Sequence, residues 1–314
     1  MSESVVNTNK NVVAVALDDR MVYGFLVLAH ALVSTARTSP FLLVGFFTGE
    51  LSRKNQALVS RLLIWLGVEH YIAELTPNSL FTERRHLTIT TFSKFVLSDL
   101  VPTPHLWLDI DTIVRPGWDS IFARISRDNE SASLVVAEKI ESRHTRFDGF
   151  NAGVLGWTSQ PRERWVEELA KLPEKRFSSE QYLFNSLYAN KVSKVDCEFN
   201  FLSSWHQDLL GRNPKILHYS GPVKPWHLVR RHSKAWQVIN PTWQFWFDAE
   251  WAFLNRARGS GILKGVHKSR RVALYSARLH TGKGALASWV MRLLAVSGPF
   301  GNPVVSVIQG RAKP

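Results

Sequence analysis

Two aspartates one residue apart follow a short apolar run in the segment Trp107-Leu108-Asp109-Ile110-Asp111-Thr112. Residues 105–108 have the composition of a buried strand. In open α/β sheets, ligands bind beyond the carboxyl ends of strands, where two carboxylates can turn toward one hard divalent cation. Such a cation can neutralise a diphosphate and stabilise it as a leaving group. A turn capped by Asp111 beside a solvated Asp109 is the alternative interpretation.

A second candidate is the segment His218-Tyr219-Ser220-Gly221-Pro222-Val223-Lys224-Pro225-Trp226. A histidine at a strand end is a candidate ligand for a borderline transition metal, and it would favour Mn²⁺ over Mg²⁺. Gly221 permits close backbone approach to a phosphate, and Lys224 supplies a point charge for that phosphate. A turn held by two prolines, with a partly buried histidine, is the alternative interpretation.

Two further segments contain polar side chains that suit a sugar. Phe150-Asn151-Ala152-Gly153-Val154 places an amide before a glycine and an apolar strand, so Asn151 can hydrogen-bond a hydroxyl group. Glu180 and Gln181 stand at the start of an expected helix and can do the same. The alternatives are a strand-opening turn for the first segment and ordinary first-turn helix residues for the second.

The elements that position these side chains follow from apolar runs and helical periodicity. We expect strands over residues 12–17, 41–48, 68–72 and 105–108, and helices over 22–36, 91–100 and 52–66, the last with Ser52 as N-cap. Less regular strands are expected over 134–137, 153–157 and 215–217, and helices over 163–171, 180–187 and 242–258. The alternating order implies an α/β fold with a mostly parallel sheet covered by helices.

The charge of the 314-residue chain is concentrated near its C-terminus. The net charge is +13, yet no Asp or Glu follows Glu250, and that segment holds eleven cations: Arg256, Arg258, Lys264, Lys268, Arg270, Arg271, Arg278, Lys283, Arg292, Arg311 and Lys313. Cations interleaved with Trp and Leu suit an anionic membrane surface, so we expect residues 251–314 to contact one, with an amphipathic helix over 285–296. A solvated, partly disordered basic tail is the alternative.

Taken in chain order, these segments resemble the family 8 glycosyltransferases, which include glycogenin and the bacterial lipopolysaccharide galactosyltransferases. The likeness spans about residues 12–226 and is greatest to the bacterial lipopolysaccharide α-galactosyltransferases. The ordered set is Ala16-Leu17-Asp18-Asp19, Arg85-His86-Leu87-Thr88-Ile89-Thr90-Thr91-Phe92, Leu108-Asp109-Ile110-Asp111, Phe150 to Val154, Glu180-Gln181 with Asn185, Phe199-Asn200-Phe201, and His218 to Trp226.

The resemblance implies a GT-A fold with a Rossmann-like sheet, and retaining transfer of a hexose from a UDP-sugar to a saccharide, lipopolysaccharide or glycolipid acceptor. Galactose is favoured over glucose. The implied cofactor is Mn²⁺, with Mg²⁺ as a substitute. The implied roles are metal binding by Asp109, Asp111 and His218; nucleotide binding by Asp18, Asp19, Asp109, Gly221 and Lys224; contact with the transferred sugar by Asn151, Glu180 and Gln181; and acceptor contact by His86 and Trp226.

Three positions depart from the family pattern. Lys94 stands where the family usually has an arginine, so a bidentate clamp on the donor sugar becomes a point charge. Met21 stands near the expected place of an aromatic side chain that stacks on uracil. Glu180-Gln181-Tyr182 replaces Asp-Gln-Asp, which removes a carboxylate near the reacting carbon. These changes leave the exact donor sugar and the rate open.

We expect three parts: a disordered N-terminus over residues 1–10, a GT-A catalytic domain over 11–228, and a helical, aromatic and basic extension over 229–314. Residues 1–10 lack the basic and apolar regions of a signal peptide, and Cys197 is the one cysteine, so no internal disulfide is possible. The expected location is the cytoplasm, with peripheral contact at the inner face of the cytoplasmic membrane.

Three other functions fit parts of the sequence. A nucleic-acid-binding protein would explain the basic charge, but no recognised RNA or DNA motif is present and the charge lies in one tail. A haloacid-dehalogenase-type phosphatase also uses Asp-x-Asp at a strand end, but near the N-terminus and with Thr or Val where this chain has Ile113. A glycogenin-like protein that glucosylates itself is the third alternative.

Overall fold

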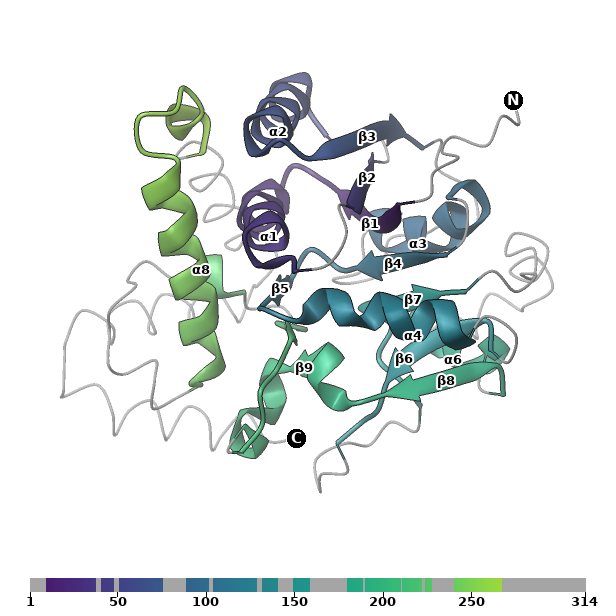
Figure 1. Ribbon diagram of the computed structural model, residues 1–314. Coiled ribbons are helices and arrows are strands. Elements are labelled where there is room, and N and C mark those ends of the chain that lie inside the picture. Colours follow the sequence, from purple (N-terminus) through teal and green to yellow (C-terminus); the bar gives the residue numbers. More distant parts are fainter. Residues whose placement is uncertain are drawn as a thin grey trace, which may run out of the picture.

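The structure is a computed structural model that describes residues 10–37, 41–47, 51–75, 89–101, 104–128, 132–140, 149–158, 180–188, 190–209, 211–221, 224–227 and 240–266. These residues form a seven-stranded sheet with helices on both faces, and a small three-stranded sheet beside it (Figure 1).

The larger sheet is mostly parallel, as the sequence predicts. Its order is β3-β2-β1-β4-β7-β6-β8, and β1 to β4 all run in one direction. β7 runs antiparallel to its neighbours β4 and β6, and β8 is parallel to β6. The strands are β1 (Asn11–Leu17), β2 (Phe41–Phe47), β3 (Glu69–Glu74), β4 (His105–Leu108), β6 (Leu134–Ala137), β7 (Val154–Trp157) and β8 (Val192–Val195).

Each face of this sheet has its own hydrophobic core, because successive side chains of a strand point to opposite faces. In β1, Val13 and Val15 join the core that contains buried side chains of α1 (Val22–Thr35) and α2 (Arg53–Leu66). The alternating β1 residues lie in a second core with α3 (Ile89–Leu100) and α6 (Glu180–Tyr188). The nearly continuous apolar runs of β1 and β2 therefore match strands that are buried on both faces.

The small sheet has the order β5-β10-β9; the sequence predicted β10, as residues 215–217, but neither β5, β9 nor their pairing. Its strands are β5 (Thr112–Val114), β9 (Phe201–Leu202) and β10 (Ile216–His218). β10 lies between the other two, antiparallel to β5 and parallel to β9. Strands of two or three residues are too short to show an alternating pattern, so pairing in space defines them rather than local sequence.

The predicted helices and strands that fall within the described residues are present, with ends shifted by a few residues. Ser52 precedes α2, but its side chain makes no capping hydrogen bond. Instead its backbone N–H donates to Oδ1 of Asp19 at 2.8 Å, so a carboxylate from the end of β1 serves the helix N-terminus. The helix α4 (Ile121–Arg127) and strand β8 were not predicted. The predicted helices over 163–171 and 285–296 lie outside the described residues.

The helix α8 (Thr242–Arg256) packs along α1 (Figure 1). Its buried Trp246 and Phe253 belong to the same core as α1 and α2. The hydroxyl of Tyr23 in α1 donates a hydrogen bond to Oε1 of Glu250 in α8, and both side chains are buried. The proposed domain boundary near residue 229 stays a prediction. Among the described residues, none of the helices has the length and apolar character needed to cross a bilayer.

The Tyr23–Glu250 hydrogen bond gives a test of how firmly α8 is joined to α1. Tyr23→Phe removes the donor from a buried carboxylate, so we expect the free energy of unfolding to fall by about 1–3 kcal/mol. Urea denaturation of the full chain measures this loss. A double-mutant cycle with Glu250→Gln should show coupling between the two positions, and additive losses would contradict a direct contact.

Candidate active site

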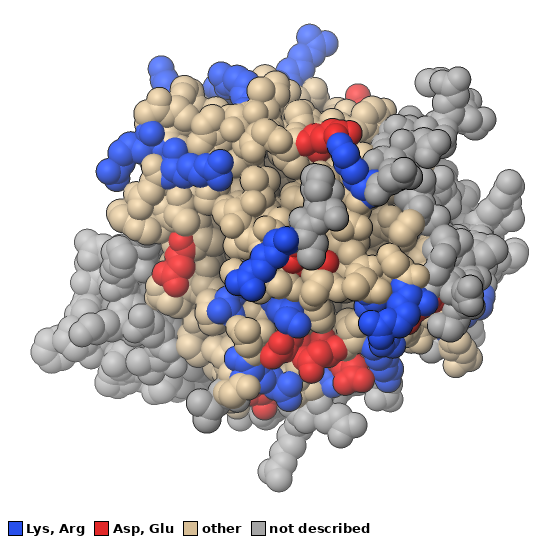
Figure 2. All heavy atoms as spheres, viewed as in Figure 1, with Lys and Arg blue, Asp and Glu red and all other residues tan. Residues whose placement is uncertain are grey.

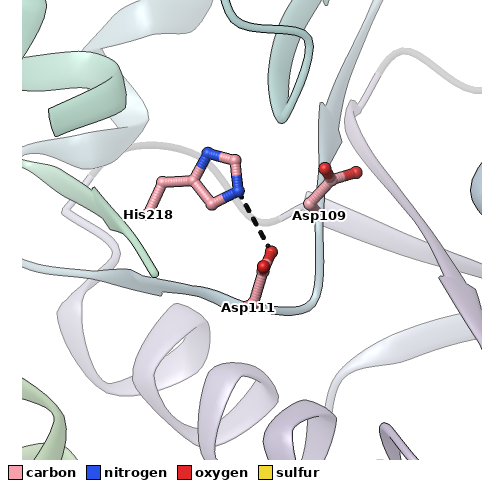
Figure 3. A group of neighbouring side chains, drawn as sticks. All are labelled: Asp109, Asp111 and His218. Atoms are coloured by element: carbon pink, nitrogen blue, oxygen red, sulfur yellow. Dashed lines mark ion pairs between the residues drawn. The ribbon is translucent and has the colours of Figure 1, made fainter. Parts of the chain in front are cut away.

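Two carboxylates and an imidazole converge where β4 ends. Asp109, Asp111 and His218 each offer one ligand atom, and these atoms all lie within 4.8 Å of one another. Nε2 of His218 is 3.2 Å from Oδ1 of Asp111. Figure 3 shows the three side chains around one point, with the imidazole facing Asp111 and the Asp109 carboxylate across from it. The structure therefore brings together the three residues expected to bind a metal.

The turn between β4 and β5 presents the two aspartates. Asp109 directly follows β4, and its carbonyl accepts hydrogen bonds from the N–H and the hydroxyl of Thr112 at 3.1 and 2.8 Å. Ile110 is buried in the core and anchors the turn. The aspartates on either side of Ile110 can therefore project their carboxylates away from that core.

Backbone pairing brings His218 to this turn. His218 is the last residue of β10 and pairs with Thr112 of β5 in the antiparallel register. The next residue, Tyr219, donates its N–H to the carbonyl of Asp111 at 2.8 Å. A histidine that is distant in sequence thus lies beside the second aspartate because of strand pairing.

Asp109 is held by one charged and one neutral donor. Nζ of Lys94 lies 3.1 Å from its Oδ1, and the indole N–H of Trp107 donates to the same oxygen at 2.8 Å. Lys94 comes from α3, is fully buried, and also donates to the carbonyl of Ala152 at 3.2 Å. Burial alone would lower the pKa of Lys94, but Asp109 and Glu180 outweigh it and raise this pKa above its ordinary value.

Asp111 uses its two oxygens for two different partners. Oδ1 faces His218, and Oδ2 accepts a hydrogen bond from Nζ of Lys224, which also donates to the carbonyl of Tyr219 at 3.0 Å. Burial alone would raise the pKa of Asp111, but the Lys224 ammonium and His218 hold it well below its usual range. Asp111 is therefore an ionised carboxylate at neutral pH.

An amide and a glycine orient the imidazole of His218. Nδ1 lies 3.1 Å from Oδ1 of Asn200, which leaves Nε2 facing Asp111, as ligation of a shared cation requires. Asn200 is itself fixed, since its Nδ2 donates to Oδ1 of Asn151 at 3.1 Å. A Cβ atom on Gly153 would lie 2.1 Å from Cε1 and 2.5 Å from Nδ1 of His218. The glycine therefore provides the space in which the ring lies.

The same amide network extends to α6. Nδ2 of Asn151 donates to Oε1 of Gln181 at 2.9 Å. Asn185, one turn further along α6, accepts the N–H of Phe150 at 2.7 Å and donates to its carbonyl at 2.8 Å. Glu180 is buried with Oε1 3.6 Å from Nζ of Lys94, and its Oε2 has no hydrogen-bond partner among the described residues. Three segments of the sequence thus form one polar cluster beside the Asp109–Asp111–His218 group.

The residues expected at the nucleotide lie at the end of β1 and beyond β10. Asp18 is buried and accepts the N–H groups of Arg20 and Met21 at 2.8 and 2.9 Å, and burial raises its pKa. Asp19 accepts the side-chain amide of Asn55 at 2.8 Å in addition to Ser52. Gly221 has a φ of 104°, a conformation that favours glycine, and a Cβ there would meet nothing within 4 Å.

Of the two residues expected to contact the acceptor, the structure describes Trp226 but not His86. Trp226 is 1% exposed, packs on Trp246 with ring centroids 4.7 Å apart, and would be 3.0 Å from a Cβ on Gly24. A side chain with so little exposed surface contacts the core rather than a dissolved saccharide, and we do not include Trp226 in the proposed acceptor site.

Two residues of this cluster received no role from the sequence. Trp107 lies in β4, two positions before Asp109. Because side chains two positions apart in an extended chain point to the same side, this spacing was the signal that could have found it. Asn200 was part of the family pattern, but its contact with His218 depends on the pairing of β9 with β10. Short-range sequence signals contain no information about that pairing.

The donor set fits a divalent cation of intermediate hardness. Carboxylate oxygens suit Mg²⁺, Ca²⁺ and Mn²⁺, whereas an imidazole nitrogen suits transition metals, and Mn²⁺ accepts both. Hydrogen bonds from neighbouring side chains also hold these ligands in place, since Asn200 orients His218 and Trp107 orients Asp109.

A model of the family described as glycosyl transferase family 8 matches residues 12–229 of this chain. The chain belongs to this family. The match begins in β1 and extends past Trp226, so it includes every site residue named above.

One curated relative is the lipopolysaccharide 1,3-galactosyltransferase of Salmonella typhimurium, which is 25% identical over 210 residues, covering 58% of this chain and 62% of the relative. The family 8 chain thus spans less than two thirds of that relative. A solved structure of the galactosyltransferase LgtC with donor and acceptor sugar analogues has a TM-score of 0.58 at 20% identity, covering 76% of this chain and 95% of the other.

GlyE of Streptococcus pneumoniae has a TM-score of 0.57 at 20% identity, covering 81% of this chain and 65% of the other. An active-site mutant of LgtC has a TM-score of 0.59. These neighbours are GT-A glycosyltransferases, so the expected GT-A fold is confirmed.

Gly153→Ala tests whether the position of the His218 ring matters for metal binding. The added methyl group overlaps the ring, so we expect the imidazole to shift and Mn²⁺ affinity to fall about tenfold or more. Titration of free Mn²⁺ by electron paramagnetic resonance measures this affinity without turnover. Gly261→Ala is the matched control, because a Cβ there meets nothing within 4 Å. Equal affinity in both variants would contradict the role assigned to Gly153.

Proposed function

We propose that this family 8 chain is a retaining glycosyltransferase that moves a hexose, with galactose favoured, from a UDP-sugar to a saccharide or glycolipid acceptor. The observation that carries the proposal is the convergence of Asp109, Asp111 and His218 within 4.8 Å, with Lys224 on the outer oxygen of Asp111. The names of the curated relative and of LgtC, both galactosyltransferases, support the sugar and suggest a lipopolysaccharide acceptor.

The metal centre and Lys224 would act on the leaving group. A Mn²⁺ ion held by Asp109, Asp111 and His218 would supply Lewis-acid stabilisation of the departing diphosphate, and Mg²⁺ could substitute. Lys224 lies close enough to this group to place a cation beside the same phosphates. Asp18 and Asp19 would lie toward the nucleoside, because they follow β1, the parallel neighbour of β4.

The amide cluster would surround the transferred sugar. Asn151 and Gln181 are partly exposed and hydrogen-bonded to each other, so hydroxyl groups of a sugar can exchange with or add to that contact. Lys94 is buried between Asp109 and Glu180, so it would hold these two carboxylates in place.

Retention of configuration is expected to follow a front-face path. Double displacement needs a nucleophile close below the sugar, as carboxylates provide in retaining glycosidases. Gln181 is an amide and a poor nucleophile, and Glu180 is buried beside Lys94. We therefore favour an oxocarbenium-like ion pair, in which the leaving phosphate oxygen accepts the proton of the attacking hydroxyl. Acceleration would then come from positioning and electrostatics.

The full chain should release UDP from UDP-galactose faster than from UDP-glucose in the presence of Mn²⁺, and a chelator should stop the release. Asp109→Asn and Asp111→Asn should each lower the rate about 100-fold or more, because each removes a charged metal ligand. Glu69→Gln is the control, since this exposed carboxylate pairs with Lys10 on the edge strand β3. The readout is free UDP per unit time.

Metal-independent release, or full activity of the two site variants, would contradict the proposal. Intact-mass measurement in the same assay distinguishes the glycogenin-like alternative from transfer to a separate acceptor, because self-glucosylation adds hexose units to the protein itself. A dissolved saccharide acceptor would leave the protein mass unchanged.

A further inference from the structure

The solvent-facing side of α2 is basic and contains an exposed aliphatic side chain. Its exposed residues recur at helical spacing and include Arg53, Lys54, Arg61 and Ile64, whereas Leu58 and Leu62 face the core. No Asp or Glu occurs in α2. A helix that only faces water usually mixes both signs of charge, so this composition calls for another explanation.

The C-terminal end of α8 and the turn that follows it lie beside α2. Ile262 and Val266 join the core that contains Leu58, and a Cβ on Gly265 would be 2.8 Å from Cδ1 of Leu58. The guanidinium of Arg256 lies 5.4 Å from the ring centroid of Trp65 in α2. The two segments therefore form one continuous surface, here called the α2–α8 corner, comprising residues 53–64 and 251–264.

The α2–α8 corner has six exposed cations and contains no carboxylate: the cations are Arg53, Lys54, Arg61, Arg256, Arg258 and Lys264. Three acids at its margins have partners among the described residues. Asp19 accepts Ser52 and Asn55, Asp248 accepts Gln244, and Glu69 pairs with Lys10. Figure 2 shows Lys and Arg side chains gathered along the edge formed by α2 and the C-terminal end of α8.

Two large apolar side chains stand among these cations. Ile64 is 67% exposed and Trp251 is 47% exposed. Tryptophan and aliphatic side chains enter the boundary between headgroups and acyl chains, while cations contact anionic headgroups. A nucleic acid would instead use stacking platforms and a groove that follows the phosphates, and an exposed isoleucine contributes to neither.

We propose that the α2–α8 corner is a docking surface for an anionic lipid bilayer. The folded surface of α2 then contributes to membrane binding together with the end of α8, in addition to the C-terminal contact that the sequence already predicts. Each cation near such a surface strengthens binding about fivefold before screening. This proposal does not depend on metal or UDP-sugar binding, so it can fail or succeed independently of the proposed catalytic function.

The experiment is flotation of the full chain with two kinds of vesicle, pure phosphatidylcholine and an equimolar mixture with phosphatidylglycerol. The wild type should float only with the anionic vesicles, and less at high salt. The variant R53E/K54E/R61E should bind them about 100-fold more weakly, even though residues 267–314 are intact. Ile64→Gln should weaken binding without a change in charge.

The matched control is R127E/K191E/K194E, which changes the net charge by the same amount on exposed cations. These residues belong to α4 and to the region of β8, at the opposite edge of the sheet from β3. The control should keep wild-type binding, and thermal unfolding should be unchanged in both triple variants. If charge reversal impairs folding, R53Q/K54Q/R61Q replaces it with an expected smaller loss in the same direction.

Several outcomes would overturn the proposal. Unchanged binding by the α2 variant would leave residues 267–314 as the sufficient contact, and equal losses in both triple variants would indicate a response to net charge alone. Failure of the wild type to float with anionic vesicles would exclude the lipid surface. Binding to duplex RNA or DNA that is lost only in the α2 variant would reassign the corner to a nucleic acid.

Discussion

The candidate site depends on the antiparallel pairing of β5 with β10. This three-residue ladder sets His218 opposite Thr112 and hydrogen-bonds Tyr219 to Asp111. Because the side-chain period of a strand is two, a slip of one residue would turn the imidazole to the other side of the sheet. Neither aspartate could then share a cation with it. The larger sheet supplies the frame, but this short pairing determines whether the three candidate metal ligands lie close together.

The charges of the site are arranged so that each aspartate has its own lysine. Lys94 approaches Asp109 from α3, whereas Lys224 approaches Asp111 from the chain that follows β10. Buried ions are stable only when opposite charges and hydrogen bonds offset their desolvation, and here the lysines and the indole of Trp107 do so. The negative charge of both carboxylates is thus compensated near the core.

The sequence predicted the parts of the fold that local patterns encode. The apolar runs of β1, β2 and β4 and the periodicity of α1 and α2 were sufficient, because burial on one or two faces leaves a signal in consecutive residues. β5 and β9 left almost none, since two or three residues cannot establish a period, whereas β10 was predicted within one residue.

The same limit separates the site residues that were found from those that were missed. Asp109 and Asp111 stand out at a strand end, and the family resemblance pointed to His218. Asn200 and Trp107 act by orienting other side chains, and their geometry exists only once distant strands have paired. Trp226 is a different case, because an aromatic residue near a site motif can also be buried in the core, and burial of Trp226 does not support the predicted acceptor contact.

The chain's positive charge obeys different rules at its two locations. In the site, Lys94 and Lys224 lie against carboxylates, and their field is largely cancelled beyond a few ångströms. The α2–α8 corner has six cations and no Asp or Glu within residues 53–64 and 251–264, so the fields of these cations add and extend about one Debye length into solution. Net charge alone cannot distinguish these cases. The surroundings of each cation distinguish those that hold the site together from those that form an exposed basic surface.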